Sequence, residues 1–338
     1  MPPTIPEKLV PVLSTVHSIV LPMSTLSAMY FVYGIYVLLF GTYMSMVTKH
    51  QQDDKYHNNR LYASLTITLF VLSTALVAIY TRFGIVGSVI RFDAIQTRDF
   101  GLLVNRLTRG TRRVVYLAFA DLLAVLLNIT VDCMLTHRCY VIWGFSKRVA
   151  IPLIVGSILI NALGIAEMTL MTIDARTSSS SYMLYKIGNL SGFAYDISIA
   201  AFNFVLTLLT AGRIWWIHRQ AYPHDIHHGA FLHSVLRIIL ESGMIYPISS
   251  ALGLILANTR TLTNYISLAP VIALSAGIAP TLIMVRAKLG KTVESMQDQV
   301  STIRFTSRPA PQEGTQMQIH LIGNPSVAEM EVESVKKQ

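Results

Sequence analysis

Polar side chains recur at helical spacing inside long apolar stretches of this 338-residue chain. Between residues 187 and 217, four of them follow one another at seven-residue intervals: Asn189, Asp196, Asn203 and Thr210. Residues at this spacing lie along one face of a helix. Two other stretches hold similar sets, which are Asp121, Asn128 and Asp132 in one and Glu167 and Asp174 in the other. Because a charge that faces lipid is costly, these polar faces are predicted to point into a helix bundle.

The inward-facing residues divide into two groups by their depth in the membrane. The first group is predicted to form an outer polar cavity and consists of Asp121, Asn128, Glu167, Asn189, Asp196 and Asn203. Its three carboxylates have no Lys or Arg beside them in the outer half of the predicted spans. Such a cavity suits a cationic ligand, a hydroxyl-rich ligand or a bound proton.

The second group is predicted to form an inner charge switch between the third and sixth helices and consists of Asp132, Arg138, Arg237 and Glu241. Arg237 and Glu241 are four residues apart, so they can pair on one helix. We expect the switch to break when the two helices move. The alternative is that both polar groups only join helices, through hydrogen bonds worth about 0.6 kcal/mol each on average.

Seven apolar stretches must position these side chains: 27–47, 61–81, 114–142, 149–173, 187–217, 234–257 and 265–285. Each is long enough to cross a bilayer, which takes roughly 20 helical residues. A hydrophobic fraction of 52% with only 13% charged residues excludes an ordinary soluble domain. The sequence therefore predicts an all-α polytopic membrane protein with a seven-transmembrane helix bundle. We expect an N-terminal segment at 1–26, the bundle at 27–285 and a largely disordered cytoplasmic tail at 286–338.

The sequence also predicts how the bundle sits in the membrane. No cleaved signal peptide is expected, so the first spanning helix serves for insertion. Outside the arginine-rich loop 82–113, Lys and Arg favour a cytoplasmic C-terminus. Trp143, Trp215 and Trp216 lie at the ends of the third and fifth helices, which face one side. We expect the N-terminus outside, the C-terminus in the cytoplasm, and the plasma membrane as the location.

The arginine-rich loop is predicted to contact the lipid bilayer, with a lid over the outer cavity or an anionic-ligand site as the alternatives. Its residues Ile85, Val89 and Phe92 recur at helical spacing, which predicts an amphipathic segment on the membrane surface. The net charge of +9 agrees with contact to anionic lipid. No nucleic-acid-binding motif is present, so no nucleic-acid partner is expected.

Several function classes are disfavoured by missing residues. The seventh stretch has no lysine for a retinal Schiff base, and no protease motif is present. The histidine-rich segment 218–233 is interpreted as a solvated loop, because nothing in it enforces a tetrahedral zinc site. We therefore expect no catalytic residues, no metal, no cofactor and no enzymatic activity.

Several short strings resemble a family of uncharacterised seven-helix integral membrane proteins from mushroom-forming fungi. They are Tyr33-Gly-Ile-Tyr36, Arg138-Cys-Tyr-Val-Ile-Trp-Gly144, Ala211-Gly-Arg-Ile-Trp-Trp216, Glu241-Ser-Gly-Met-Ile-Tyr246 and Leu289-Gly-Lys291. The resemblance covers roughly residues 27 to 305 and implies the architecture and a fungal source, but no activity. The chain resembles G-protein-coupled receptors in outline only, with His137-Arg138-Cys139 where rhodopsin-type receptors carry Asp/Glu-Arg-Tyr. Its seventh stretch lacks an Asn-Pro-x-x-Tyr motif.

Two functions remain open from the sequence. The first is a receptor-like sensor, which implies a small-molecule ligand in the outer polar cavity and a heterotrimeric G protein as partner. The second is a transporter or proton-coupled carrier that uses the buried carboxylates to bind protons or cations. No inverted repeat is evident among the odd-numbered helices, which disfavours the carrier.

Overall fold

A computed structural model describes residues 20–49, 57–97, 111–176, 182–221, 240–258 and 267–306. Within these ranges the chain is helical and contains no strand. The helices are α1 (Leu21–Lys49), α2 (His57–Thr97), α4 (Thr111–Ile142), α5 (Lys147–Arg176), α6 (Tyr182–Ala221), α8 (Ile245–Asn258) and α9 (Ala269–Thr306). Residues 1–292 form one compact unit, and residues 293–338, which include the last part of α9, form a second.

Six of the described helical segments are long and apolar enough to cross a bilayer. They are Leu21–Thr48, Arg60–Ala94, Val114–Ile142, Lys147–Asp174, Lys186–Ile217 and Ala269–Leu289. A further apolar helical segment, Leu240–Leu256, is shorter and follows directly on residues outside the described ranges. The chain is therefore an all-helical, multi-pass membrane protein.

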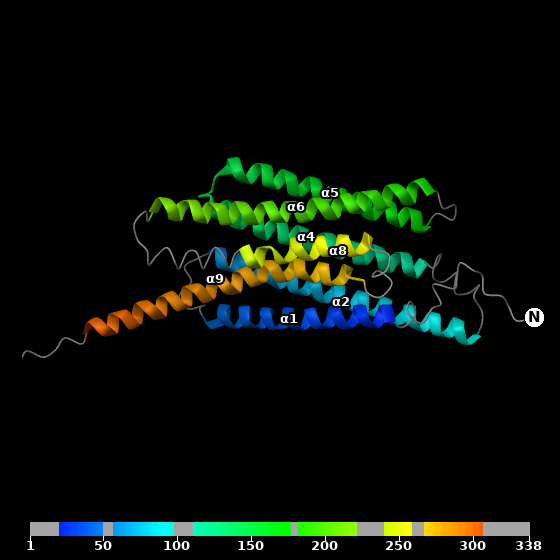
Figure 1. The fold of residues 1–338 in the computed structure, drawn as a ribbon, viewed down its shortest axis with the longest axis horizontal. Coiled ribbons are helices and arrows are strands. Elements are labelled where there is room, and N and C mark those ends of the chain that lie inside the picture. Colours follow the sequence, from blue (N-terminus) through cyan, green and yellow to red (C-terminus); the bar gives the residue numbers. More distant parts are fainter. Residues whose placement is uncertain are drawn as a thin grey trace, which may run out of the picture. The chain divides into compact units, whose positions relative to one another are not determined.

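Consecutive helices of the first unit run in opposite directions (Figure 1). We call the end where α1, α4, α6 and α9 begin the first end, and the opposite end the second end. Helix α4 packs against α2, α5 and α6, while α1 packs on α2 and α8 packs on α6. At the first end, the Ser267 backbone N–H donates to the Thr25 hydroxyl at 3.0 Å, which joins the start of α9 to α1. This arrangement brings α4 and α6, the helices with most of the predicted polar sites, into direct contact.

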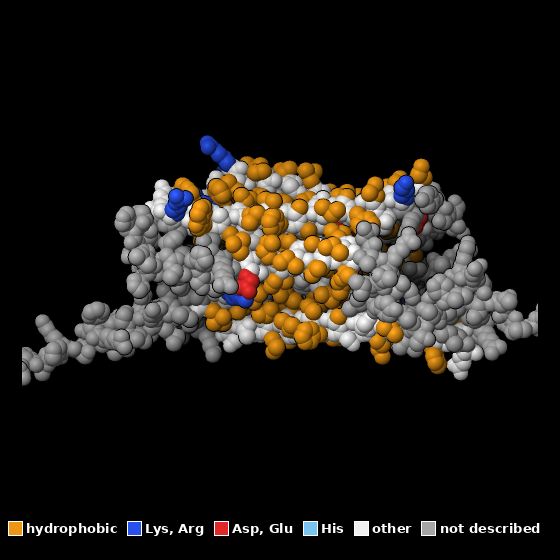
Figure 2. Space-filling model, viewed as in Figure 1, with side chains coloured by type: hydrophobic (Ala, Val, Ile, Leu, Met, Phe, Trp, Pro, Cys, Tyr) orange, Lys and Arg blue, Asp and Glu red, His pale blue; other side chains and the backbone are white. Residues whose placement is uncertain are grey.

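Apolar side chains cover the outside of the bundle as well as its core. Phe31, Leu38 and Leu159 are at least 66% exposed, although each lies well inside a spanning segment. The face drawn in Figure 2 carries hydrophobic side chains across its middle, while most charged side chains of the described residues lie nearer its two ends. An apolar surface of this kind is stable in lipid and not in water.

The helix ends differ from the sequence prediction in three places. Helix α1 begins at Leu21 and not at Ser27, because Pro22 falls in the first turn, where its missing N–H costs no hydrogen bond. Helix α2 runs on to Thr97, so the predicted separate surface segment at Ile85–Phe92 is a continuation of the second helix. Helix α9 continues beyond Val285 to Thr306. The predicted disorder of the tail after Thr306 lies outside the described residues.

A tight turn joins α4 to α5 at the end of the Arg138–Gly144 string. Gly144 and Phe145 both have positive φ, at 64° and 61°. The Phe145 N–H donates to the Tyr140 carbonyl at 3.0 Å, and the Gly144 N–H donates to the Val141 carbonyl at 3.1 Å. This pattern is a Schellman motif, and its hydrophobic contact is the edge-on pair of Tyr140 and Phe145 rings, 5.3 Å apart. The turn fixes the angle at which α5 leaves α4.

Substituting Gly144 by alanine is expected to destabilise the protein by about 1 kcal/mol, because a Cβ disfavours the left-handed backbone that this position adopts. Thermal unfolding in detergent measures the loss. Gly41→Ala is the matched control, since nothing lies within 4 Å of a Cβ at that helical glycine. A variant at Gly144 that unfolds at the wild-type temperature would show that this backbone conformation is not needed.

Helix α8 is preceded by an irregular turn. Leu240–Gly243 is helical, Met244 is in a turn, and the helix resumes at Ile245. Pro247 has no N–H to donate to the carbonyl of Gly243, so one hydrogen bond of the helix is missing at this point. The Met244 N–H still donates to Leu240, and the Ile248 N–H donates to Met244, at 2.9 and 3.0 Å. Pro247 therefore coincides with a local interruption of the helical segment that begins at Leu240.

Candidate functional site

A cavity of about 460 Å³ lies in the half of the bundle nearer the first end. Its lining comes from α2, α4, α6, α8, the start of α9 and the two residues before it. The polar side chains among its lining residues are Tyr80, Asn128, Tyr195, Asp196, Tyr246, Ser250 and Ser267. Leucine, isoleucine, alanine and phenylalanine side chains form most of the remainder. This volume lies within the range typical of small-molecule sites.

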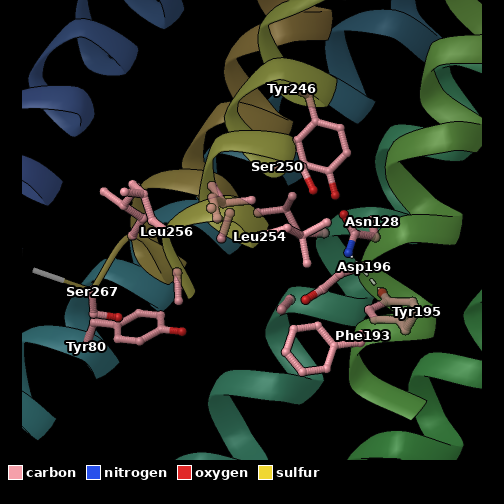
Figure 3. Close-up of a pocket in the computed structure, with 17 residues that line it drawn as sticks. Tyr80, Asn128, Phe193, Tyr195, Asp196, Tyr246, Ser250, Leu254, Leu256 and Ser267 are labelled. Atoms are coloured by element: carbon pink, nitrogen blue, oxygen red, sulfur yellow. Dashed lines mark hydrogen bonds between the residues drawn. The ribbon is translucent and has the colours of Figure 1, made fainter. Parts of the chain in front are cut away.

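The polar groups point into the cavity from different helices. In Figure 3 the Asp196 carboxylate of α6 faces the open space, with the Tyr80 hydroxyl on one side and the Tyr246 hydroxyl on another. The Asn128 amide donates to the Tyr195 hydroxyl at 2.9 Å, which ties α4 to α6 at the cavity wall. Because Tyr195 is held in this way, its ring forms a fixed part of the wall.

Two of the six residues predicted for the outer polar cavity, Asn128 and Asp196, line this space. Asp121 and Glu167 do not line it, but the Glu167 carboxyl interacts electrostatically with both Asp121 and Asp196. Glu167 lies beside Gly192 of α6, where an added Cβ would contact its Cγ and Oε1 at 3.5 Å. The three predicted carboxylates therefore lie in one region, contributed by α4, α5 and α6.

The other two predicted cavity residues lie elsewhere on α6. Asn189 is exposed, and Asn203 is buried with its amide donating to the Ile199 carbonyl at 3.0 Å. A seven-residue spacing drifts by about 20° per repeat on a straight helix, so the face turns by about 60° from Asn189 to Thr210. With this drift, the polar stripe passes from an exposed position at Asn189 through the cavity at Asp196 to a buried position at Asn203.

The inner charge switch residues do not form a single cluster within the described part of the chain. Asp132 is buried against α5, where its Oδ2 accepts from the Ser157 hydroxyl at 2.7 Å and from the Asn161 amide at 3.0 Å. Arg138 interacts electrostatically with Tyr62 of α2. Arg237 lies outside the described residues.

The fourth switch residue, Glu241, pairs with a residue that the sequence prediction did not include. Its carboxylate lies 3.4 Å from the Arg286 guanidinium of α9, and the same guanidinium lies 3.4 Å from the Ser242 hydroxyl. The pair therefore links the start of the Leu240–Leu256 segment to α9. Glu241 and Arg286 are 45 residues apart in sequence, so helical spacing alone could not predict that they pair.

Aromatic and hydroxyl residues are the main functional candidates that sequence reasoning missed. These residues carry no charge, so a search of the sequence for buried charged residues does not find them. They are Tyr80, Tyr195, Tyr246 and Ser250. Ser157 and Asn161 offered a detectable signal, since they are four residues apart in an otherwise apolar stretch and therefore share a helix face.

The tryptophans predicted to share one side do so. Arg213 of α6 lies over the rings of Trp143 and Trp216, with its Cζ 5.1 and 4.3 Å from the two ring centroids. Trp215 and Trp216 are about half exposed. An aromatic and cationic cluster of this kind is typical of a helix end at a membrane surface, and it lies at the second end of the bundle.

Among the described residues, no group of three or more His, Cys, Asp and Glu side chains is arranged to hold a metal ion. The histidines between residues 222 and 239 lie outside those residues. Comparisons of the chain with models of protein families, with curated proteins and with solved structures found no match.

Proposed function

We propose that this chain is a seven-helix receptor-like sensor of the plasma membrane, with its N-terminus outside and its C-terminus in the cytoplasm. In this proposal Leu240–Leu256 belongs to the sixth of seven spanning helices. The observation that carries the proposal is the cavity around Asp196, which combines a carboxylate, three tyrosines and an apolar wall. Its position nearer the first end puts it on the outer side in this orientation.

The chemistry of the lining suggests a small amine with an apolar or aromatic body. The Asp196 carboxylate can accept hydrogen bonds from an ammonium group, and such charged bonds are the strong ones. Tyr80 and Tyr246 offer both hydroxyls and ring faces to a cation. The Leu254 and Ile272 side chains supply the apolar surface that the body of the ligand would cover.

Helix α8 and the residues just before it provide a route from the cavity to the second end. Tyr246 and Ser250 of α8 line the cavity, while Glu241, shortly before α8, pairs with Arg286. The irregular turn at Met244 lies between these two points. A ligand that shifts α8 would therefore act on the Glu241–Arg286 pair. The predicted pairing of Glu241 with Arg237 stays a prediction, because Arg237 lies outside the described residues.

A proton-coupled carrier is the second candidate function. The grouping of Asp121, Glu167 and Asp196 in one region favours it, because like charges brought together readily take up a proton or a cation. A carrier must also expose this region alternately to both sides of the membrane. A sensor needs only one access route.

Co-purification from a fungal host separates the two functions. If the chain is a receptor, a heterotrimeric G protein should purify with it in detergent and dissociate when a non-hydrolysable GTP analogue is added. The Arg286→Gln variant tests the ion pair at the second end, because it removes that pair and is expected to change the amount of bound G protein. No nucleotide-sensitive association, together with proton flux into liposomes that contain the protein, would support the carrier instead.

A further inference from the structure

A second polar site, separate from the cavity, lies between α4 and α5 and is centred on Asp132. The Asp132 side chain is 1% exposed, and the two hydrogen bonds from Ser157 and Asn161 both reach its Oδ2. Its other oxygen, Oδ1, is buried and has no hydrogen-bond partner. A carboxylate offers about four lone-pair positions, so the two on Oδ1 accept no hydrogen bond.

Two further buried oxygens near this carboxylate also lack partners. Asn161 is 6% exposed and its Oδ1 has no hydrogen bond, although its Nδ2 lies only 3.0 Å from Asp132 Oδ2. Thr136 lies one helical turn after Asp132 on α4, is 8% exposed, and its Oγ1 is likewise unpartnered. The Ser157 hydroxyl donates to Asp132 and accepts from the Asn161 amide at 3.2 Å, which leaves it one lone pair. The unused hydrogen-bonding positions of these four side chains therefore include oxygen lone pairs from each of them.

The charge of Asp132 has no counterpart in the part of the chain that the structure describes. No Lys or Arg there forms an ion pair with it. Unpaired buried acceptors and an uncompensated buried charge each cost free energy, and more so inside a membrane. Buried polar atoms without partners in a native protein point to an ion or water that satisfies them.

We propose that this site binds one sodium ion, held by the oxygens of Asp132, Asn161, Thr136 and Ser157. Oxygen donors from carboxylate, amide and hydroxyl groups suit hard cations and disfavour soft metals. The site contributes a single negative charge, so a monovalent ion leaves it neutral, whereas a divalent ion would leave a buried positive charge. The site lies between α4 and α5 and shares none of these residues with the lining of the cavity. The proposal therefore stands whether or not the chain is a receptor.

The test is the thermal stability of the purified full-length protein in detergent, with sodium chloride replaced by N-methyl-D-glucamine chloride at constant ionic strength. A ligand that binds only the folded state stabilises it in proportion to its saturation. We expect saturating sodium to raise the unfolding temperature by about 4 °C.

The Asp132→Asn variant distinguishes an ion site from a purely structural hydrogen-bond acceptor. The amide keeps the shape and can still accept from Ser157, but it removes the charge. In the sodium-free buffer we expect this variant to unfold at a temperature equal to or above that of the wild type, and we expect sodium to have no effect on it. A structural acceptor alone predicts that the variant is less stable than the wild type in both buffers.

Two further variants serve as a second measurement and a control. Thr136→Val keeps the side-chain shape and both hydrogen bonds to Asp132, and is expected to shift the sodium dependence to higher concentration. Asp174→Asn removes a carboxylate from α5 outside the site and should keep the wild-type sodium response. The proposal is overturned if the wild type shows no sodium-dependent shift, or if Asp132→Asn retains it. Stabilisation by acid without any effect of sodium would assign the site to a proton, and the absence of both effects would assign it to water.

Discussion

Substituting Gly164 by alanine is expected to destabilise the protein by about 1–3 kcal/mol, the usual effect of forcing an extra carbon into a packed core. Gly164 of α5 lies against the Tyr195 ring of α6. A Cβ at Gly164 would lie 2.6 Å from Tyr195 Cε2 and 2.8 Å from Cζ, closer than real atoms approach. Because the Tyr195 hydroxyl is held by Asn128, the ring cannot move aside without losing that hydrogen bond.

Thermal unfolding in detergent measures this effect, and Gly34→Ala on α1 is the matched control. Nothing lies within 4 Å of a Cβ at Gly34, so there alanine only restricts the unfolded chain and should stabilise the helix by up to about 1 kcal/mol. The two substitutions are chemically identical and should have opposite signs. If both raise the unfolding temperature, α5 and α6 are not packed as closely as the Tyr195 contact requires.

The Gly164→Ala variant should also alter the cavity, because Tyr195 forms part of its wall. The Asn128→Leu variant breaks the same hydrogen bond without the steric contact. A loss of ligand binding in both variants would attribute the effect to the part of the wall that Asn128 and Tyr195 form together. A loss in Gly164→Ala alone would attribute it to the displacement of α5.

Replacing Asp196 by asparagine is expected to weaken the binding of a small aromatic monoamine by about 10-fold to 100-fold. The reason is that a hydrogen bond to a charged group contributes about 1.5–3 kcal/mol. A tryptamine-type and a phenethylamine-type amine are suitable probes, because both combine an ammonium group with a ring. Binding is measured by thermal stabilisation of the purified protein and by radioligand displacement on membranes.

The Asp174→Asn variant is the control for Asp196→Asn, since it removes a carboxylate that does not line the cavity. We expect Asp174→Asn to bind the amines with wild-type affinity. If amines bind equally well to the wild type and to Asp196→Asn, the cavity does not use this carboxylate for recognition. If no amine binds the wild type while the Asp196 variant loses proton flux in liposomes, the carrier is favoured over the sensor.

The positions of helices were largely predictable from the sequence, because spanning a bilayer requires an apolar stretch of known length. The residues at which these helices begin and end were less predictable. The continuation of α9 to Thr306 lies in polar sequence, where hydropathy no longer follows the helix. Most of the continuation of α2 to Thr97 belongs to the apolar spanning segment Arg60–Ala94, which the prediction ended too early, at Thr81. The interruption before α8 coincides with Pro247, whereas Pro152 and Pro280 lie within continuous helices, so proline alone did not predict where a helix is interrupted.

The candidate site was predictable only in part. The seven-residue spacing of Asn189, Asp196 and Asn203 indicated a polar face of α6, yet only Asp196 reaches the cavity. Spacing along one helix gives the direction of a side chain relative to its neighbours on that helix. It does not give the rotation of the helix about its axis within the bundle, which depends on packing against other helices.

The sequence by itself determined that this is a multi-pass helical membrane protein with carboxylates inside its spans, because the cost of polar groups in lipid acts on each segment separately. The tertiary structure alone decided which residues meet. Asp132 accepts hydrogen bonds from Ser157 and Asn161 of α5 and does not pair with Arg138. Glu241 pairs with Arg286, which lies 45 residues later in the sequence. Such pairings depend on which helices are neighbours and how each is rotated, and both follow from close packing over the whole bundle.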